Sequence, residues 1–177
     1  MLFKHLIELY ELLDSPQASG AIVANYLKAI DPECTVETYP LEGPKGITDM
    51  VRVRIPGAHG KSNGGDAPTI GLLGRLGGLG DGALTALACA AKLLDMHKKG
   101  DVLPGDVFVS THVCPHAPTM PHKPVPFMGS PTSTAAINAE EVTPELDAIL
   151  VVDTTKGNRI ANNRGFAISP TVKQGVV

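Results

Sequence analysis

Apolar side chains recur at helical spacing in three stretches of the chain. Residues 2–13 carry leucines one helical turn apart until residues 14–16 (DSP) interrupt the pattern. Residues 20–30 (GAIVANYLKAI) form a second apolar stripe, and Ser19 can cap it. Residues 81–100 are rich in alanine and leucine and end in two lysines and a glycine, which favours a long, closely packed helix. We expect helices over these ranges.

Five other stretches have the pattern of strands. Residues 34–41 (CTVETYPL) and 49–55 (DMVRVRI) alternate apolar and polar side chains, as is typical of strands with one solvated face. Residues 69–78, 106–113 and 146–155 contain nearly continuous apolar runs, as is typical of strands buried on both faces. Buried strands that alternate with helices predict an α/β fold. We expect a three-layer sandwich with helices on both faces of a mixed, mainly parallel central sheet.

The composition narrows the class of protein. The 177 residues, 43% hydrophobic and 19% charged, predict a single globular domain over residues 1–177. A net charge of -3 with scattered lysines and arginines disfavours a nucleic-acid partner. Three widely spaced cysteines do not suggest a disulfide framework, and no apolar run reaches the ~18 residues that a membrane span needs. We expect a cytoplasmic protein that does not bind membranes.

Polar side chains follow each of the three apolar runs. Arg75 and Asp81 follow the first run, residues 111–122 (THVCPHAPTMPH) follow the second, and Asp153 ends the third. In open α/β sheets, ligands bind beyond the carboxyl ends of the strands. We therefore predict that Arg75, Asp81, His116 and Asp153 lie in one pocket at a single edge of the sheet.

The histidine-containing segment allows several interpretations. If it is extended, His112, Cys114 and His116 point the same way and could hold a soft divalent metal. The spacing matches no strong zinc motif, and histidines in a proline-stiffened loop more often form surface hydrogen bonds. Cys114 could instead be a nucleophile beside a histidine, but the sequence supplies no orienting acid or oxyanion loop nearby.

The other candidates also have structural interpretations. Asp153 could cap the turn that follows it, and Asp81 could be the N-cap of the long helix. The glycines of residues 74–82 (GRLGGLGDG) suggest a phosphate-binding loop only superficially. They match neither the dinucleotide-binding fingerprint nor the P-loop pattern.

Four segments carry a resemblance to a known family that spans nearly the whole chain. The sequence resembles the uncharacterised bacterial and archaeal family called domain of unknown function 1177, a name that implies no activity. The segments are TIGLLGRLGGLG, DGALTALACAAKLLDMHKKGDVLPGDVFVSTHVCPHAPT, PVPFMGSP and DAILVVDTTKGNRIANNRGFAISPTVKQG.

The order of elements is also similar, more distantly, to zinc aminopeptidases of the glutamyl-aminopeptidase and acetylornithine-deacetylase type. This resemblance implies a His-x-Asp pair after the first buried strand, where residues 75–77 read Arg-Leu-Gly. It places Asp81 at the bridging aspartate and Asp153 at a later metal-binding aspartate. Residues 115–116, Pro-His, replace the Glu-Glu pair that supplies a general base and a ligand. The resemblance thus implies a single metal, zinc or a similar ion, held by Asp81, His116 and Asp153.

Two hypotheses for the function follow. The first is a metal-dependent, aminopeptidase-like hydrolase of an amide or peptide-related small molecule, with His112 as acid or base. The second is a catalytically silent relative that binds a small ligand or builds an oligomer. In it, Arg75 would clamp a carboxylate or phosphate where a metal ligand is expected.

The junction at residues 80–81 and the last residues of the sequence suggest that further chain belongs to this fold. From the resemblance we expect that this chain lacks a short acidic loop between Gly80 and Asp81 and a C-terminal portion after Val177. The apolar, strand-like residues 167–177 would leave an unpaired sheet edge, which proteins cover with more chain or with a partner. We therefore expect a symmetric homo-oligomer.

Overall fold

The computed structural model describes residues 2–75, 80–121, 123, 127–154 and 166–170. Helices and strands form at the predicted places, and several further short elements appear. The helices are α1 (Leu2–Asp14), α2 (Gly20–Ile30), α3 (Asp81–Lys98) and α4 (Thr134–Glu141), with a 3-10 turn at Lys61–Asn63. The strands are β1 (Thr35–Gly43), β2 (Gly46–Ile55), β3 (Ile70–Gly74), β4 (Val107–Val113), β5 (Thr119–Met120), β6 (Phe127–Met128), β7 (Ala148–Thr154) and β8 (Phe166–Pro170).

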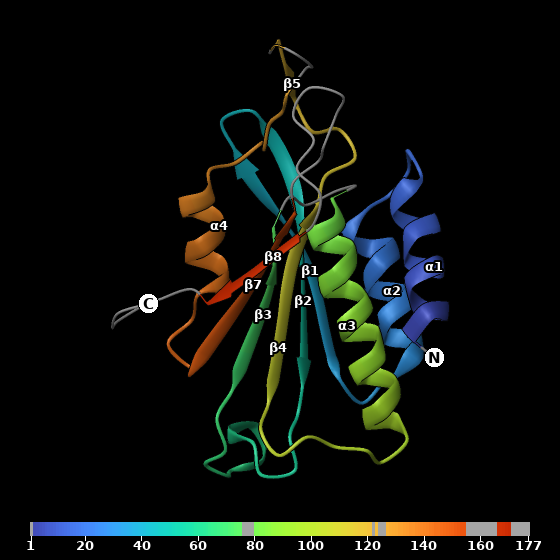
Figure 1. Ribbon diagram of the computed structural model, residues 1–177, viewed down its shortest axis with the longest axis vertical. Helices are drawn as coiled ribbons and strands as arrows, with labels where there is room; N and C mark the ends of the chain where they lie inside the picture. Colours follow the sequence, from blue (N-terminus) through green and yellow to red (C-terminus); the bar gives the residue numbers. More distant parts are fainter. Residues whose placement is uncertain (1, 76–79, 122, 124–126, 155–165, 171–177) are drawn as a thin grey trace.

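The main sheet has the strand order β1-β2-β4-β3-β7-β8 (Figure 1). Its inner strands β4, β3 and β7 are parallel, so their carboxyl ends lie at the same edge. The hairpin β1–β2 adds to β4 in an antiparallel direction, and β8 pairs antiparallel with β7. The sheet is therefore mixed, as predicted, with its parallel part in the middle. The short strands β5 and β6 form a separate ribbon.

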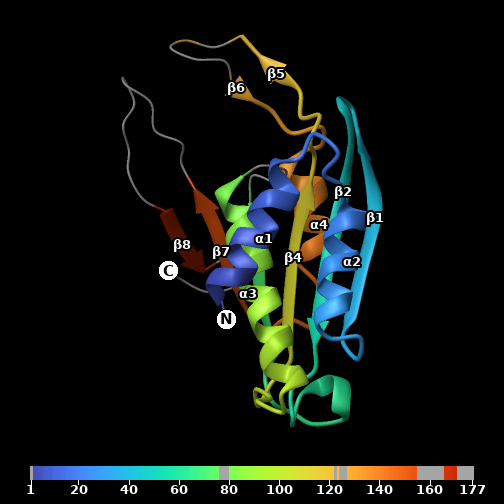
Figure 2. The same ribbon diagram turned by 90° about the vertical axis from the view of Figure 1, so that its right-hand side faces the viewer.

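Helices cover both faces of the sheet, which confirms the three-layer prediction. Figures 1 and 2 show α1, α2 and α3 on one face and α4 on the other. The larger core lies under α1–α3, where Val53, Val109, Leu87 and Leu27 are buried. A smaller core is built from Leu73, Phe108, Leu146 and Ile149, of which Leu146 lies in the segment that follows α4.

Local signals in the sequence explain where these helices begin. The Ser19 hydroxyl accepts a hydrogen bond from the Ile22 amide at the start of α2, as predicted. The Ser133 hydroxyl accepts from the Ala136 amide and caps α4, a helix that the apolar pattern did not predict. The N-cap of α3 is Gly80, and Asp81 is the first helical residue. The interpretation of Asp81 as the N-cap was therefore wrong by one position.

The predicted solvated face of β2 is partly covered. Val53 is buried toward α1–α3, whereas Arg52 and Arg54 point to the opposite face. There Arg52 pairs with Glu140 of α4, and Arg54 pairs with Glu145 just beyond it. The unpredicted helix α4 and the segment after it thus partly cover this polar strand face with ion pairs, of which the pair Arg54–Glu145 stays exposed.

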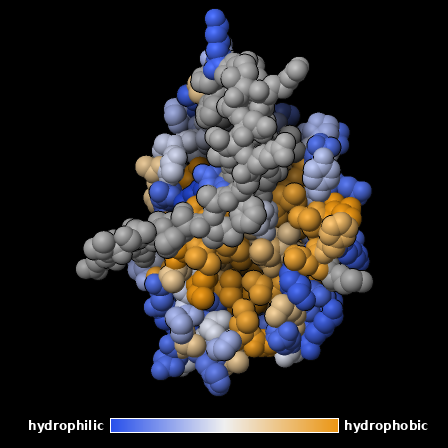
Figure 3. Space-filling model, in the orientation of Figure 1, coloured by the Kyte–Doolittle hydropathy of each residue, from blue (hydrophilic) through white to orange (hydrophobic). Residues whose placement is uncertain are grey.

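The described surface keeps some apolar area. Figure 3 shows hydrophobic residues gathered in the middle of the view, and Ile70 and Leu150 are among the large apolar side chains that remain partly exposed. Among the described residues, no helix has the length and apolar character to cross a membrane. Residues 171–177, part of the predicted edge segment, lie outside the described residues.

Candidate functional site

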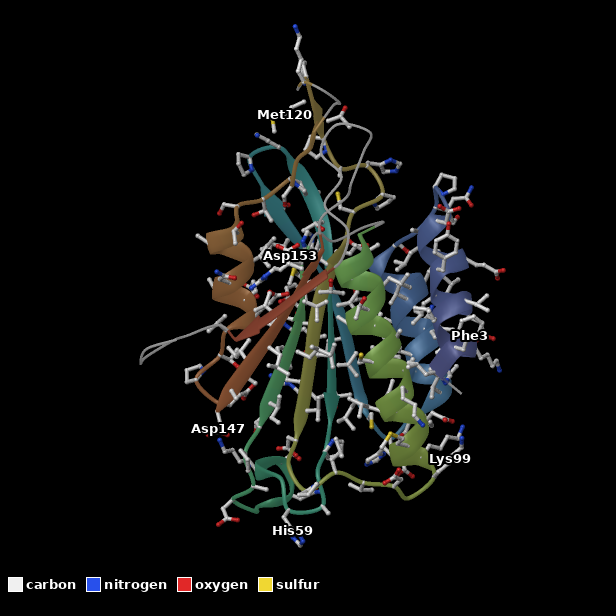
Figure 4. The ribbon with its side chains drawn as sticks, in the orientation of Figure 1. Phe3, His59, Lys99, Met120, Asp147 and Asp153 are labelled. Carbon is white, nitrogen blue, oxygen red and sulfur yellow. The ribbon has the colours of Figure 1, made fainter. Side chains whose placement is uncertain are left out.

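A pocket of about 280 Å³ lies beyond the carboxyl ends of the inner strands. Arg75 follows β3, His112 and Cys114 come from the end of β4, and Asp153 belongs to β7. The opposite wall comes from α4 and the segment before it: Gly129, Ser130, Pro131, Thr134 and Ile137. Figure 4 shows the labelled Asp153 near the upper end of β7. The topology thus brings three strand ends to one cavity, because β4, β3 and β7 are parallel.

The structure brings some of the residues that were predicted from the sequence into this pocket, but not all of them. Arg75, His112 and Asp153 all line this pocket. His116 is exposed on the turn after β4 and is not among the lining residues. The side chain of Asp81 lies outside the described part of the structure. The roles of Asp81, His116 and Asp153 as metal ligands stay predictions.

His112 is buried on the face of β4 that looks toward the pocket. Its Nδ1 lies 3.0 Å from the Thr48 hydroxyl, which donates its own proton to the Val113 carbonyl oxygen. Because a carbonyl only accepts and a hydroxyl has one proton, Nδ1 must carry the hydrogen, and Nε2 is the acceptor nitrogen. Burial, together with the Arg75 cation, lowers the pKa of His112 to about 4. The imidazole is therefore neutral at physiological pH.

The side chain of Arg75, which follows β3, is anchored to α4. Its guanidinium forms an ion pair with Glu141 and donates a 2.6 Å hydrogen bond to the Asn138 side-chain oxygen, both on α4. Glu141 is fully buried, and burial raises the pKa of its carboxyl even though Arg75 favours the charged form. Truncating either member would leave the other charge in the interior, so this pair ties the pocket wall together.

Three buried polar atoms near this ion pair have no hydrogen-bond partner within the described protein: Arg52 Nε, Ser110 Oγ and Glu141 Oε1. Arg52 and Ser110 are direct neighbours across β2 and β4. Burial is the main influence on the pKa of the Glu141 carboxyl, and the nearby Arg52 cation opposes it. The layer between the sheet and α4 thus contains buried polar and charged side chains beside the smaller apolar core.

The thiol of Cys114 has no features of a nucleophile. Cys114 is buried, and its thiol donates to the Ile47 carbonyl oxygen at 3.6 Å. Burial raises the pKa of this thiol above its ordinary value. Because the thiolate is the reactive form, the interpretation of Cys114 as a nucleophile loses its support.

A second group of potential metal ligands lies away from the pocket. Asp31, Cys34 and His97 offer a carboxylate oxygen, a sulfur and a ring nitrogen that lie within 4.8 Å of one another, so these residues could hold a metal ion. Within the described residues, no comparable group forms at the pocket. The sequence analysis missed this group, since His97 is distant in sequence and no spacing motif joins the three residues.

Sequence reasoning also missed the α4 side of the pocket. Glu141 and Asn138 belong to a short helix without a clear apolar stripe, and acidic residues in such a helix usually face solvent. The one available signal was Ser133 in front of residues 134–141, which is a good N-cap. It predicts a helix but not the burial of its last glutamate.

Comparisons with known proteins agree with the fold. Residues 40–177 match the family described as "Protein of unknown function (DUF1177)". Among solved structures, the bottromycin maturation enzyme BotP is similar, with a TM-score of 0.50 and 12% sequence identity over 84% of this chain and 41% of that chain. This chain thus spans less than half of the length of that enzyme, and the likeness shows a shared fold alone. The search of curated proteins found no match.

Proposed function

This chain belongs to the DUF1177 family, and from that premise we propose that it is a hydrolase that cleaves an amide bond in a small, peptide-related molecule, using one divalent metal at the pocket beyond β3, β4 and β7. The observation that carries the proposal is the meeting of Arg75, His112 and Asp153 at one cavity of about 280 Å³. A cavity of this size suits a small molecule.

The donors at this edge suit a metal such as zinc. Carboxylate oxygen and neutral imidazole nitrogen are ordinary zinc ligands, and we propose Asp81, His116 and Asp153 for this role, as the peptidase resemblance implies. His116 would have to turn from its exposed position on the loop after β4. A bound metal would polarise the amide carbonyl and supply an activated water.

His112 and Arg75 have separate tasks in this proposal. The Nε2 atom of His112 can accept a hydrogen bond, and the bond between Nδ1 and Thr48 fixes the ring orientation. With a pKa of about 4, His112 is a weak base, and it positions the substrate rather than storing a proton. Arg75 holds the pocket wall through Glu141 and can face a carboxylate of the substrate with its remaining donors.

The alternative is a catalytically silent protein that binds a small ligand in the same pocket. A specific observation favours it. Arg75 stands where the zinc peptidases have a metal ligand, and its guanidinium is committed to Glu141 and Asn138. A cation anchored at this place opposes metal binding and favours an anionic ligand.

One experiment separates the two functions. The purified chain, its Asp153→Asn variant and the control Asp101→Asn would be loaded with zinc, freed of excess metal, and tested on a panel of amino-acid amides and N-acyl amino acids. Asp101 is an exposed aspartate outside the pocket lining. For the hydrolase we expect zinc-dependent cleavage that Asp153→Asn abolishes and Asp101→Asn retains. Cleavage that is equal in all three proteins would refute the proposed site.

The alternative, a catalytically silent ligand-binding protein, predicts a different outcome. It would show no cleavage, but N-acyl amino acids would shift the His112 ring resonances in an NMR titration of the full chain. A lack of both cleavage and shifts at His112 would refute both functions for this pocket. We further propose that the chain forms a homo-oligomer, which light scattering would detect.

A further inference from the structure

The consecutive elements α2 and β1 meet the distant helix α3 at the end of the molecule opposite the pocket. Asp31 is the C-cap of α2, Cys34 directly precedes β1, and His97 lies in the last turn of α3. Figure 4 labels Lys99, the C-cap of α3, at this end of the molecule. Asp31 and Cys34 are buried, and His97 is only slightly exposed. Their side chains converge although 63 residues separate Cys34 from His97.

The distances between the three ligand atoms resemble those around a tetrahedral zinc ion. The Cys34 sulfur lies 3.4 Å from Asp31 Oδ2 and 3.5 Å from His97 Nδ1. With ordinary zinc bond lengths, the sulfur-to-oxygen and sulfur-to-nitrogen edges of a tetrahedron are roughly 3.5 Å. Only the distance from His97 Nδ1 to Asp31 Oδ2, now 2.6 Å, would have to widen, to roughly 3.3 Å.

The arrangement does not fit a cysteine nucleophile with a histidine base. In such a triad the thiol and the acid contact different ring nitrogens, so that the ring can pass a proton between them. Here Cys34 and Asp31 both approach Nδ1 of His97. Three ligand atoms of different kinds (oxygen, sulfur and nitrogen) that point at one location are typical of a cation-binding site.

The local charges and hydrogen bonds also suit a divalent cation. The Glu33 amide binds Asp31 Oδ1 at 3.1 Å, which leaves Oδ2 on the side of the sulfur and the imidazole. Such an outer hydrogen bond orients a ligating carboxylate. One carboxylate, one thiolate and a neutral imidazole together would balance the two charges of zinc.

We propose that Asp31, Cys34 and His97 form a zinc site that joins α2, β1 and α3. Zinc binds the thiolate sulfur of Cys34 and the neutral imidazole of His97, whose hydrogen then lies on Nε2. The thiol proton, and any second proton on the imidazole, is released to solvent. Asp31 Oδ2 and His97 Nδ1 supply two further bonds, and a water molecule completes the tetrahedron. The metal replaces the present contact between Asp31 and His97 with a link among three elements.

This site is separate from the pocket. Asp81 begins α3 beside the pocket edge, and His97 lies 16 positions later (97 − 81) in the same helix. At 1.5 Å per residue, the two ends are about 24 Å apart along the helix axis. A zinc ion at His97 therefore cannot touch a molecule bound near Asp153. We assign it a structural role, which stands whether or not the pocket is a hydrolase site.

Cobalt is a suitable probe because thiolate ligation gives it a near-ultraviolet charge-transfer band, and tetrahedral geometry gives it strong visible bands. The full-length chain, reduced and freed of metal, would be titrated with Co²⁺ alone and then with Zn²⁺, which should remove the bands. The variants are Cys34→Ser and His97→Gln, with Cys89→Ser, Cys114→Ser and Asp153→Asn as controls. Cys89 and Cys114 are the other free cysteines, and Cys114 tests a thiolate ligand at the pocket.

We expect the charge-transfer band in the wild type and in all three controls, and its loss in Cys34→Ser. Should Cys34→Ser fail to give a native circular dichroism spectrum, His97→Gln decides, since it keeps the thiol but should weaken cobalt binding and change the visible bands. Absence of the band in the wild type would overturn the site, as would its loss in Cys114→Ser with retention in Cys34→Ser. The activity of the pocket has no influence on this readout.

Discussion

The buried ion pair between Arg75 and Glu141 gives the sharpest test of how the pocket wall is held. Glu141 has no solvent exposure, and the side chain of Arg75 is 14% exposed. In Arg75→Met, the aliphatic stem is roughly kept, but the guanidinium that compensates Glu141 is lost. The hydrogen bond to Asn138 is lost as well.

The expected cost follows from the burial of the remaining charge. Removing one partner of a buried ion pair typically destabilises a protein by ~3–5 kcal/mol, because the other charge stays without compensation. The matched control is Lys99→Met, which removes the exposed pair with Asp95 on α3. A pair of this spacing near the surface contributes little to stability, because water and salt screen it. The two variants should therefore differ by several kcal/mol in the free energy of unfolding.

The cost should also depend on pH in a defined direction. Burial holds the folded pKa of Glu141 above its ordinary value, and Arg75 opposes this rise. Removing Arg75 raises the folded pKa further. A carboxyl with a raised folded pKa contributes stability that is complete below its unfolded pKa and is lost as the pH rises through its folded pKa. The penalty of Arg75→Met should thus be largest at high pH and shrink as the pH falls through the folded pKa.

Urea unfolding followed by circular dichroism, at several pH values, measures these differences. The double variant Arg75→Met/Glu141→Leu should recover part of the loss, because it removes the stranded charge. A cost below ~1 kcal/mol for Arg75→Met, or a cost that grows in acid, would refute the reasoning.

Two further predictions concern the same end of the sheet. Gly82→Ala should destabilise the fold by ~1–3 kcal/mol in urea unfolding. The reason is that a Cβ atom at this position would lie 2.4 Å from the Arg75 carbonyl oxygen and 2.8 Å from the Val152 carbonyl oxygen. If the variant is as stable as the wild type, α3 can move away and the prediction is wrong. NMR titration of His112 should give a pKa of about 4, and this pKa should rise in Arg75→Met because a nearby cation is removed. The folded pKa of His112 lies below the ordinary value of 6.5. His112 therefore contributes roughly 3 kcal/mol to the free energy of unfolding, and this contribution is fully present above pH 6.5 and is lost as the pH falls through 4. Stability of His112→Gln should then fall less than that of the wild type over this range, and an equal fall would contradict the assignment.

The sequence alone determined most of the architecture. Leucine spacing in residues 2–13 and the Ser19 cap predicted the first two helices, and alternation in residues 49–55 predicted β2 and its two faces. The continuous apolar runs predicted the inner strands, and their parallel arrangement was enough to bring Arg75 and Asp153 to one pocket. These features follow from local backbone periodicity and from the burial of one face, both of which can be read from consecutive residues.

The tertiary structure decided which partner each polar side chain has. The sequence does not show what anchors Arg75, and the docking of α4 gives it Glu141, a residue that resembles a surface acid in the sequence. Likewise, 66 residues separate Asp31 from His97, and only the packing of α2 beside the end of α3 brings them together. Periodicity tells which face of an element is buried. The partner of a buried charge depends on how separate elements meet in space, and no local pattern along the chain carries that information.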